Sequence, residues 1–358
     1  MSVNPILVAR SMVVGLFLAG VAVSCGASSD SESAQESTTT TRATVGETTA
    51  ETVETSQTMP SQGFVAPLSG VAVDDPTTIE RPALVVKIDN HPNARPQLGL
   101  DQADLVFDYR AEGVTRFAGV FHSKLPETVG PVRSSRTADF DLVVGFNRPL
   151  YASSGGNDNV MGGLSRLPVQ AVTNQTRREY FRDNSRPAPH NLLVHPADLY
   201  ALADPESQAP EPWFEYRADG QSVSSSAVPA NSTVTVAFAE GPTVGFSWDE
   251  GNGWLRTQNG MAHVTSQGDQ LAPENVVILI TSYGTSSADS RSPEVRSTGS
   301  GELIVLTDGH IITGTWERST GLDRPSLLDD QGNTIALTPG QTWLLWPEPG
   351  QVDLGLDS

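Results

Sequence analysis

Short apolar runs separated by turn residues dominate the first part of the chain. Residues 83–88 form a nearly continuous apolar run, which predicts a strand that ends at Asp89. Residues 104–111 and 115–122 predict two more strands, and Glu112-Gly113 between them indicates a hairpin. Strands are also predicted at 150–153 and 189–194, and helices at 96–103, 137–146, 157–167 and 197–203. This alternation predicts one α/β lobe over residues 64–203.

From residue 212 onward the pattern changes to short β-like segments punctuated by Gly, Asn and Asp. The segments lie at 232–239, 243–248, 275–282, 303–306 and 342–346. No helical period of any length appears there. Residues 204–211 are rich in Pro and acidic side chains and predict a linker. The predicted fold is therefore mixed α+β, with a β-rich C-terminal lobe (212–358) after the N-terminal α/β lobe.

The first 24 residues have the pattern of an export signal. Arg10 supplies a positive charge, and the apolar stretch from Ser11 to Ser24 is too short to span a bilayer of about 30 Å. Cys25 follows and is the only cysteine, so it has no partner for an internal disulfide. Ala22-Val23-Ser24-Cys25 resembles a bacterial lipobox, in which the thiol is diacylglycerylated. The alternative is an ordinary secretory signal with an unpaired cysteine.

A lipidated Cys25 would anchor the protein to the outer face of the cell membrane, because each buried CH₂ adds about 0.8 kcal/mol. Residues 25–63 are mostly Ser, Thr, Glu and Ala. This composition buries too little apolar surface to offset the entropy of ordering the chain. We therefore expect a disordered tether, and an extracytoplasmic location for the folded part.

The net charge of −20 argues against nucleic acid as a partner. The charge is unevenly distributed, because residues 81–195 contain 14 Lys and Arg and 11 Asp and Glu, a net of +3. The rest of the chain therefore has a net charge of −23. A mildly basic segment in an acidic protein is where we expect an anionic ligand to bind.

The densest group of basic residues is the turn from Gly130 to Arg136. Arg133, Ser134, Ser135 and Arg136 place two guanidinium groups and two hydroxyls together, which can hold a carboxylate or a phosphate. The alternative is that the arginines pair with Asp139, Asp141 or Asp108 and only stabilise the turn. Ion-pair networks and anion sites use the same residue types, so both interpretations remain open.

Polar residues elsewhere in this lobe can join the turn in one cleft. The candidate ligand-binding residues are Asp89, Asn90, His91, Arg95, Glu112, Arg116, Arg133, Ser134, Arg136, His190 and Asn191. This mixture suits recognition of an anionic component of the cell envelope, such as peptidoglycan or an anionic wall polymer, or of an envelope protein. The alternatives are an envelope hydrolase or transferase in the same cleft, and a buried polar network that only stabilises the lobe.

No cofactor or metal is expected, because the histidines and carboxylates match no ligand spacing known for metal sites. The tryptophans at 248, 254, 316, 343 and 346 of the second lobe could form sugar-binding platforms. We interpret them instead as core residues, since each buries a large apolar area.

Several motifs in the same order resemble the YerB-like bacterial lipoproteins. They include Val86 to Gln97, Gly130 to Ser134, Ala188 to Leu192 and, in the second lobe, Pro339 to Trp343. The resemblance extends from about Phe64 to the C-terminus in two parts, which match the two predicted lobes. It implies a secreted or membrane-anchored protein, and it implies no mechanism, because the biochemical activity of that family is not established.

Overall fold

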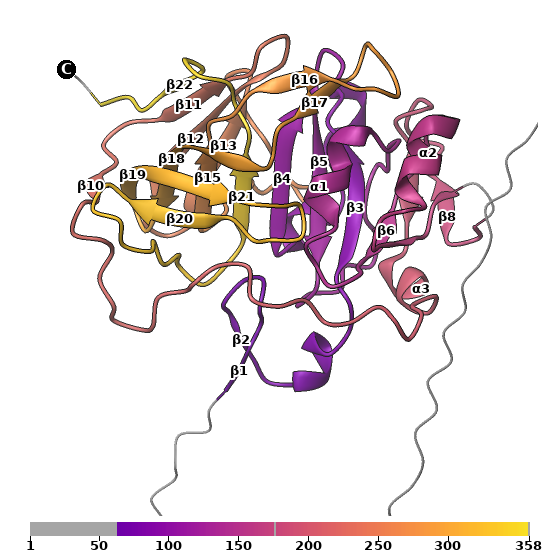
Figure 1. Ribbon diagram of the computed structural model, residues 1–358, viewed down its shortest axis with the longest axis horizontal. Helices are drawn as coiled ribbons and strands as arrows, with labels where there is room; N and C mark the ends of the chain where they lie inside the picture. The colour runs from indigo at the N-terminus through magenta and orange to yellow at the C-terminus, as the bar shows by residue number, and fades with distance from the viewer. Residues whose placement is uncertain (1–62, 175–176, 357–358) are drawn as a thin grey trace, which may run out of the picture. The chain divides into compact units, whose positions relative to one another are not determined.

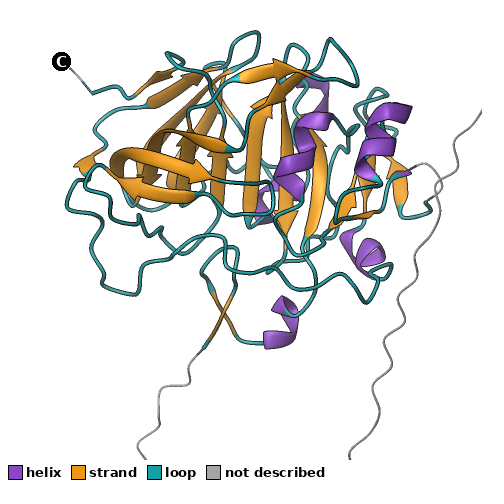
Figure 2. Ribbon diagram, in the orientation of Figure 1, coloured by secondary structure: helices purple, strands orange, loops and turns teal. Residues whose placement is uncertain are grey.

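The computed structural model describes residues 63–174 and 177–356. The predicted signal peptide (1–24), Cys25 and all of the predicted tether except Gly63 lie outside these residues. Strands predominate over short helices (Figures 1 and 2), which confirms the predicted mixed, β-rich fold. Among the described residues no helix has the length and apolar character needed to cross a membrane.

Eleven strands form one large sheet that draws on both halves of the chain. In order across the sheet they are β10 (Val228–Pro229), β19 (His310–Arg318), β18 (Gly299–Thr307), β15 (Asn275–Leu279), β21 (Thr342–Leu345), β4 (Leu105–Arg110), β5 (Thr115–Phe121), β3 (Leu84–Asp89), β6 (Leu150–Ala152) and β7 (Gln170–Ala171), with β20 (Ser326–Asp329) paired to β19. In Figure 1 the C-terminal strands, orange and yellow, lie beside the N-terminal strands in indigo and purple.

Strand β21 connects the two halves of this sheet. It pairs in parallel with β15 on one side and with β4 on the other, so that Leu344 lies opposite both Val277 and Phe107. All four residues of β21 are buried. One hydrogen-bonded sheet therefore contains strands from residues 64–203 and strands from residues 212–358.

A second sheet and three strand pairs complete the β-structure. The five-stranded sheet has the order β14 (Met261–Ala262), β13 (Gly253–Gln258), β12 (Thr243–Asp249), β11 (Val234–Ala237) and β22 (Val352–Asp353). The pairs are β1 (Phe64–Val65) with β2 (Ala72–Val73), β8 (Tyr180–Arg182) with β9 (Leu192–Val194), and β16 (Tyr283–Thr285) with β17 (Pro293–Val295).

The helices are shorter than the sequence pattern predicts. Helices α1 (Phe140–Val143), α2 (Asp158–Leu164) and α3 (Pro196–Tyr200) lie within or next to three predicted segments. The fourth, 96–103, contains only the 3-10 turn η3 (Leu100–Gln102). Further 3-10 turns are η1 (Pro76–Ile79), η2 (Pro92–Ala94) and η4 (Thr137–Asp139). Pro92 and Pro196 open their helices, where the missing N–H has no cost.

Alternate residues of the central strands face two separate hydrophobic cores. Leu84, Val86 and Ile88 of β3 belong to a core shared with β11, β12 and β13 of the five-stranded sheet. Val85 belongs to a second core, which includes Leu142 of α1. Burial on both faces explains why these strands read as continuous apolar runs.

The core interpretation of the tryptophans is confirmed for four of the five. Trp254, Trp316, Trp343 and Trp346 are fully buried. Trp248 is partly buried and packs against Trp254, with 5.3 Å between the ring centroids.

Candidate functional site

The turn from Gly130 to Arg136 runs beside the carboxyl end of β3. The Arg133 N–H donates to the carbonyl of Lys87, and the Asp89 N–H donates to the carbonyl of Pro131, both at 2.8 Å. Strand β6 pairs only with residues 84–86 of β3, so the turn occupies the edge of β3 beyond it. This path brings Arg133 to the side chain of Asp89.

Asp89 lies at the centre of the predicted set. Its buried carboxylate is 2.5 Å from Nη1 of Arg116, 3.2 Å from Nε of Arg133 and 2.6 Å from Nδ1 of His190. It also accepts the backbone N–H of His91 at 3.0 Å. Burial opposes its ionisation, but the Arg116 charge and the hydrogen bonds outweigh burial and lower the pKa of Asp89. Asp89 is therefore a carboxylate at neutral pH.

His91 and His190 form a stacked pair above this carboxylate, with ring centroids 4.0 Å apart and 12° between the planes. Because an ionised carboxylate only accepts hydrogen bonds, His190 donates from Nδ1 to Asp89. Nδ1 of His91 accepts the Asn93 N–H at 3.1 Å, which leaves the proton of a neutral His91 on Nε2. Desolvation and the adjacent His190 lower the pKa of His91, which favours that neutral form.

Arg133, His190 and His91 are the partly exposed residues on the outer side of this cluster. The side chains of His190 and Arg133 are 12% and 21% exposed, whereas that of Asp89 is 0% exposed. The outer surface of the cluster therefore presents a guanidinium and an imidazole, with the balancing carboxylate behind them. We call this surface, formed by Arg133, His190 and His91 over Asp89, the Asp89 surface.

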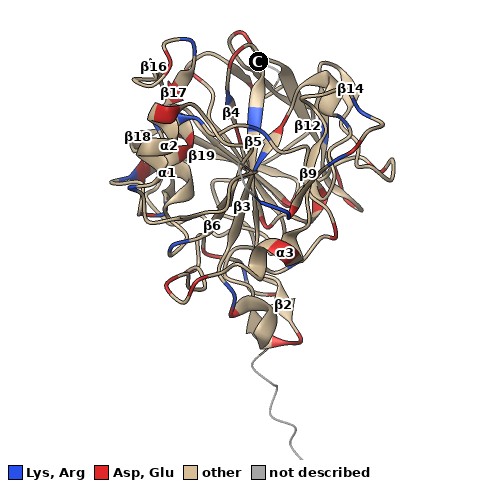
Figure 3. Ribbon diagram, turned by 90° about the vertical axis from the view of Figure 1, so that its right-hand side faces the viewer, with Lys and Arg blue, Asp and Glu red and all other residues tan. Residues whose placement is uncertain are grey.

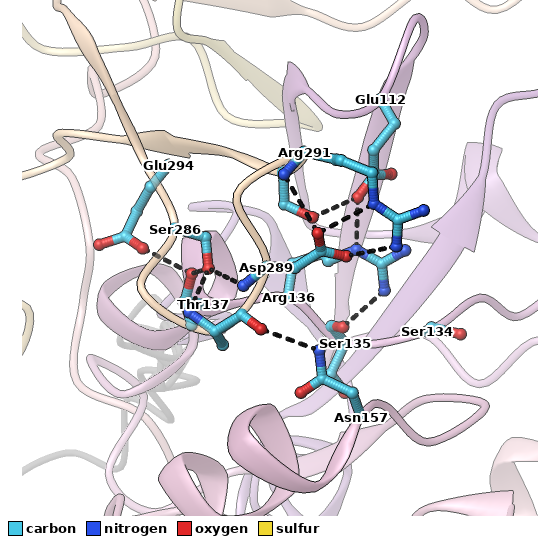
Figure 4. Close-up of polar contacts among 12 residues, drawn as sticks. Glu112, Ser134, Ser135, Arg136, Thr137, Asn157, Ser286, Asp289, Arg291 and Glu294 are labelled. Atoms are coloured by element: carbon cyan, nitrogen blue, oxygen red, sulfur yellow. Dashed lines mark hydrogen bonds and ion pairs between the residues drawn. The ribbon is translucent and has the colours of Figure 1, made fainter.

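Arg136 and Glu112 form a separate ion pair, with 2.6 Å between Nε and the carboxylate (Figure 4). The hydroxyl of Ser292, in the loop between β16 and β17, donates to the same carboxylate at 2.5 Å. Burial opposes ionisation of Glu112, but the hydrogen bonds from Arg136 and Ser292 lower its pKa to about 2. Thr137 donates to Glu294 at 2.5 Å in the same region. These contacts fasten a C-terminal loop to the N-terminal turn.

The alternative partners expected for the arginines of the turn are engaged elsewhere. Asp139 pairs with Lys87 at 2.6 Å, and Asp108 pairs with Arg256 of β13 at 2.8 Å. Among the described residues no side-chain ion pair joins Asp108, Asp139 or Asp141 to the turn arginines, so that expectation is wrong. The guanidinium groups of the turn instead reach Asp89 at the end of β3 and Glu112 just after β4, whereas Asp139 accepts from the turn only the backbone N–H of Arg136, at 2.8 Å.

Sequence reasoning missed the buried cluster behind the turn. Lys87 and the hydroxyls of Tyr109 and Tyr151 all bond to the carboxylate of Asp139, and all four side chains are fully buried. Desolvation, partly offset by Asp139, lowers the pKa of Lys87 to about 8. A lysine inside an otherwise apolar run was the available signal, since a buried charge requires a partner.

Asn90 and Arg95 lie on the inner side of the site. The Asn90 amide donates to Thr115 at 2.8 Å and to Gln258 at 3.2 Å, and Arg95 donates to the Asn90 carbonyl at 3.3 Å. Gln258 also accepts from the buried Arg256 at 3.0 Å. These residues join β3 to the five-stranded sheet, so the buried-network interpretation fits them better than ligand binding does.

Asn191 and Ser134 complete the predicted set. Asn191 is buried, and its amide donates to two carbonyls of the 183–186 loop. The Ser134 hydroxyl lies 3.1 Å from that of Ser154. In the part of the chain that the structure describes, no serine hydroxyl is hydrogen-bonded to a histidine ring, which is the contact that activates a serine nucleophile.

Neither a metal-binding cluster nor a broad charged patch marks the side of the described molecule that carries β3, β6 and α3. Within residues 63–174 and 177–356 no group of three or more His, Cys, Asp or Glu is placed to hold a metal ion. Figure 3, which looks onto the side of β3, β6 and α3, shows basic and acidic segments interspersed. Recognition here would therefore depend on local geometry more than on a broad charged patch.

The fold and the site define a class of two-part proteins whose N- and C-terminal regions complete one β-rich sheet. The family models for the protein of unknown function DUF3048 match in two parts, the N-terminal domain at residues 68–209 and the C-terminal domain at 234–344. The chain belongs to this family. The two-part YerB-like resemblance is thereby confirmed.

A relative from Bacillus subtilis, matched both by its sequence and by its crystal structure, gives the family a context. A Bacillus subtilis (strain 168) protein named "Putative lipoprotein YerB" is 29% identical over 296 residues, which cover 78% of this chain and 85% of that protein. The crystal structure of YerB protein from Bacillus subtilis has a TM-score of 0.69 and 25% identity, and covers 81% of this chain and 99% of that one. The relative's name describes that protein as a putative lipoprotein, and the family description supplies no activity.

Proposed function

We propose that the protein is anchored by a lipid on Cys25 at the outer face of the cell membrane. There it recognises an anionic envelope component, or an envelope protein bearing an acidic group, through the Asp89 surface, without catalysis. The lipobox-like sequence at Cys25 and the similarity to a lipoprotein support this membrane-anchored location. The export signal and the tether give the folded part access to the cell wall.

The observation that carries the binding proposal is the uneven charge count around one carboxylate. Asp89 is shared by Arg116 and Arg133, so the ion-paired core of the cluster has one positive charge in excess before His190 is counted. Arg116 is 9% exposed and Arg133 is 21% exposed, so the excess charge can reach a ligand through Arg133. A guanidinium beside an imidazole suits a carboxylate or phosphate oxygen.

Two sources supply such an anion in a cell wall. Peptidoglycan offers carboxylates on its peptides, and anionic wall polymers offer phosphates. Both are bound by the same donors, and an acid-treated wall from which the polymers have been removed separates them experimentally.

The second candidate function, an envelope hydrolase or transferase, rests on the hydrogen bond between Asp89 and His190. That bond holds the ring with Nε2 free to act as a base, in the way a carboxylate orients a catalytic histidine. The nucleophile would have to come from the substrate or from water, since Ser134 bonds to Ser154. Turnover of wall polymers that His190→Gln abolishes would favour this candidate.

The test is sedimentation of the full-length protein, kept in mild detergent, with purified cell-wall sacculi at low and high salt. We expect salt-sensitive binding that Arg133→Gln reduces about tenfold, the usual effect of losing a charge-assisted hydrogen bond. Arg148→Gln is the matched control, because its side chain is also partly exposed and ion-paired but lies at Asp204. Equal binding by both variants would refute the proposed site.

A further inference from the structure

A pocket of about 920 Å³ lies at the ends of β4 and β5 that are opposite to the Asp89 surface. Its lining includes Asp104 and Ser123, which immediately precede β4 and closely follow β5. Asp89, in contrast, pairs with Arg116 near the start of β5. The lining also includes several residues between 265 and 274, and residues 339–341. The pocket is thus a separate place on the molecule, built by both parts of the family fold.

The pocket is acidic, because one lysine faces four carboxylates. The charged lining residues are Asp101, Asp104, Asp269, Glu274 and Lys124. The Asp104 carboxylate accepts hydrogen bonds from the Ser123 hydroxyl, at 2.5 Å, and from two backbone N–H groups. Among the described residues the other three carboxylates form no ion pair.

Glu274 is the carboxylate that the fold holds in place. One of its oxygens accepts the Gln341 N–H at 2.7 Å, and its side chain lies directly on Gly340. A Cβ added to Gly340, whose φ is +147°, would come within 2.4 Å of Cγ and Cδ of Glu274. Burial raises the pKa of Glu274, and the backbone hydrogen bonds and the Lys124 charge that oppose this shift compensate the carboxylate only in part.

The hydroxyl of Ser69 is an independent indication that a polar ligand belongs in the pocket. Ser69 lines the pocket and is only 3% exposed, and within the described residues its hydroxyl has no hydrogen-bond partner. Its carbonyl accepts the Gly340 N–H at 2.7 Å, which places it next to the Glu274 support. Buried hydroxyls are normally paired, so an unpaired one in the wall of a pocket points to a missing polar partner.

We propose that this pocket binds an alkylammonium group, with the cation at Glu274 and the alkyl chain against Leu255 and Leu271. An ammonium supplies a positive charge beside the Glu274 carboxylate and three donors for polar atoms of the lining. The two leucines in the lining give the carbon chain an apolar contact. The acidic lining repels an anionic ligand, so the chemistry is opposite to that of the Asp89 surface.

The test is a calorimetric titration of the full-length protein in mild detergent with 1,5-diaminopentane at neutral pH and low salt. The uncharged 1-pentanol is the control ligand. We expect saturable binding of the diamine only, weakened about tenfold by Glu274→Gln, as for the loss of one charge-assisted hydrogen bond. Asp269→Asn, an exposed position, should weaken binding by a smaller factor of about three.

The matched control is Glu317→Gln, which removes an exposed charge on β19 outside the pocket and should leave the affinity within about twofold. Arg133→Gln should also leave diamine binding unchanged, which separates this proposal from the Asp89 surface. The proposal is overturned if the wild-type protein binds the diamine no better than the alcohol. It is equally overturned if Glu274→Gln and Glu317→Gln have the same effect.

Discussion

Glu112 illustrates how one side chain can join the two family regions and make their contact sensitive to pH. Its folded-state pKa is lowered from 4.5 to about 2, chiefly by hydrogen bonds that overcome burial. The stabilisation is therefore fully present above pH 4.5 and is lost as the pH falls toward about 2.

We expect Glu112→Gln to lower the free energy of unfolding by about 1–2 kcal/mol near neutral pH, after a discount for partial exposure. The difference from wild type should shrink at low pH, because the wild-type carboxylate then becomes protonated. Urea unfolding of both proteins near neutral pH and at low pH measures this difference in the free energy of unfolding. Glu250→Gln, an exposed acid elsewhere, is the control. A destabilisation that persists undiminished at low pH would contradict the role given to the ionised carboxylate.

Part of the candidate site could be predicted from the sequence at this scale. The sequence placed Asp89 at the end of one strand, Arg116 near the start of another, and both in one candidate cleft, but the pairing of those two strands is known only from the structure. The pairing of Lys87 with Asp139 was not predictable, because it depends on how η4 packs behind β3. Asp139 was one of three carboxylates expected as a partner of the turn arginines, and it instead pairs with Lys87 and accepts from the turn only the backbone N–H of Arg136.

At the scale of elements, β21 is the strand on which the large sheet depends. It lies between β15 and β4 and pairs in parallel with both, and Leu344 at its centre is fully buried. Replacing a buried leucine by alanine removes apolar contacts and leaves a cavity.

We expect Leu344→Ala to lower the free energy of unfolding by about 2–5 kcal/mol. Because β21 contacts both neighbours, amide hydrogen exchange should accelerate in β15 and in β4 alike. Leu322→Ala, at a 63% exposed leucine, should change stability by less than about 0.5 kcal/mol. Acceleration confined to β15 would show that β21 does not couple the two regions.

The strand segments themselves were largely predictable, because apolar runs bounded by turn residues mark them. Predicted strands at 83–88, 104–111 and 115–122 correspond to β3, β4 and β5. The long β19 and the strand β13 were missed, because their polar residues interrupt the apolar pattern. The pairing of β21 with β4 was also beyond sequence reasoning, since parallel partners far apart in the chain leave no local signal.

At the scale of the whole described molecule, sharing one sheet has a consequence for the site. Ser292 and Gln258, from the C-terminal region, support Glu112 and Asn90 of the N-terminal region. The surroundings of Asp89 are therefore held by both family domains. An isolated N-terminal region would lack these supports, which is why both binding proposals are tested on the full-length chain.

Anion recognition at the Asp89 surface is tested most directly by an NMR titration of the full-length, histidine-labelled protein with inorganic phosphate. The chain has six histidines. We expect saturable shifts at His190 and His91, with the other four histidines unchanged, and loss of these shifts in Arg133→Gln but not in Arg148→Gln. Phosphate that shifts no histidine, or that shifts His190 equally in the Arg133→Gln variant, would contradict anion recognition at the Asp89 surface.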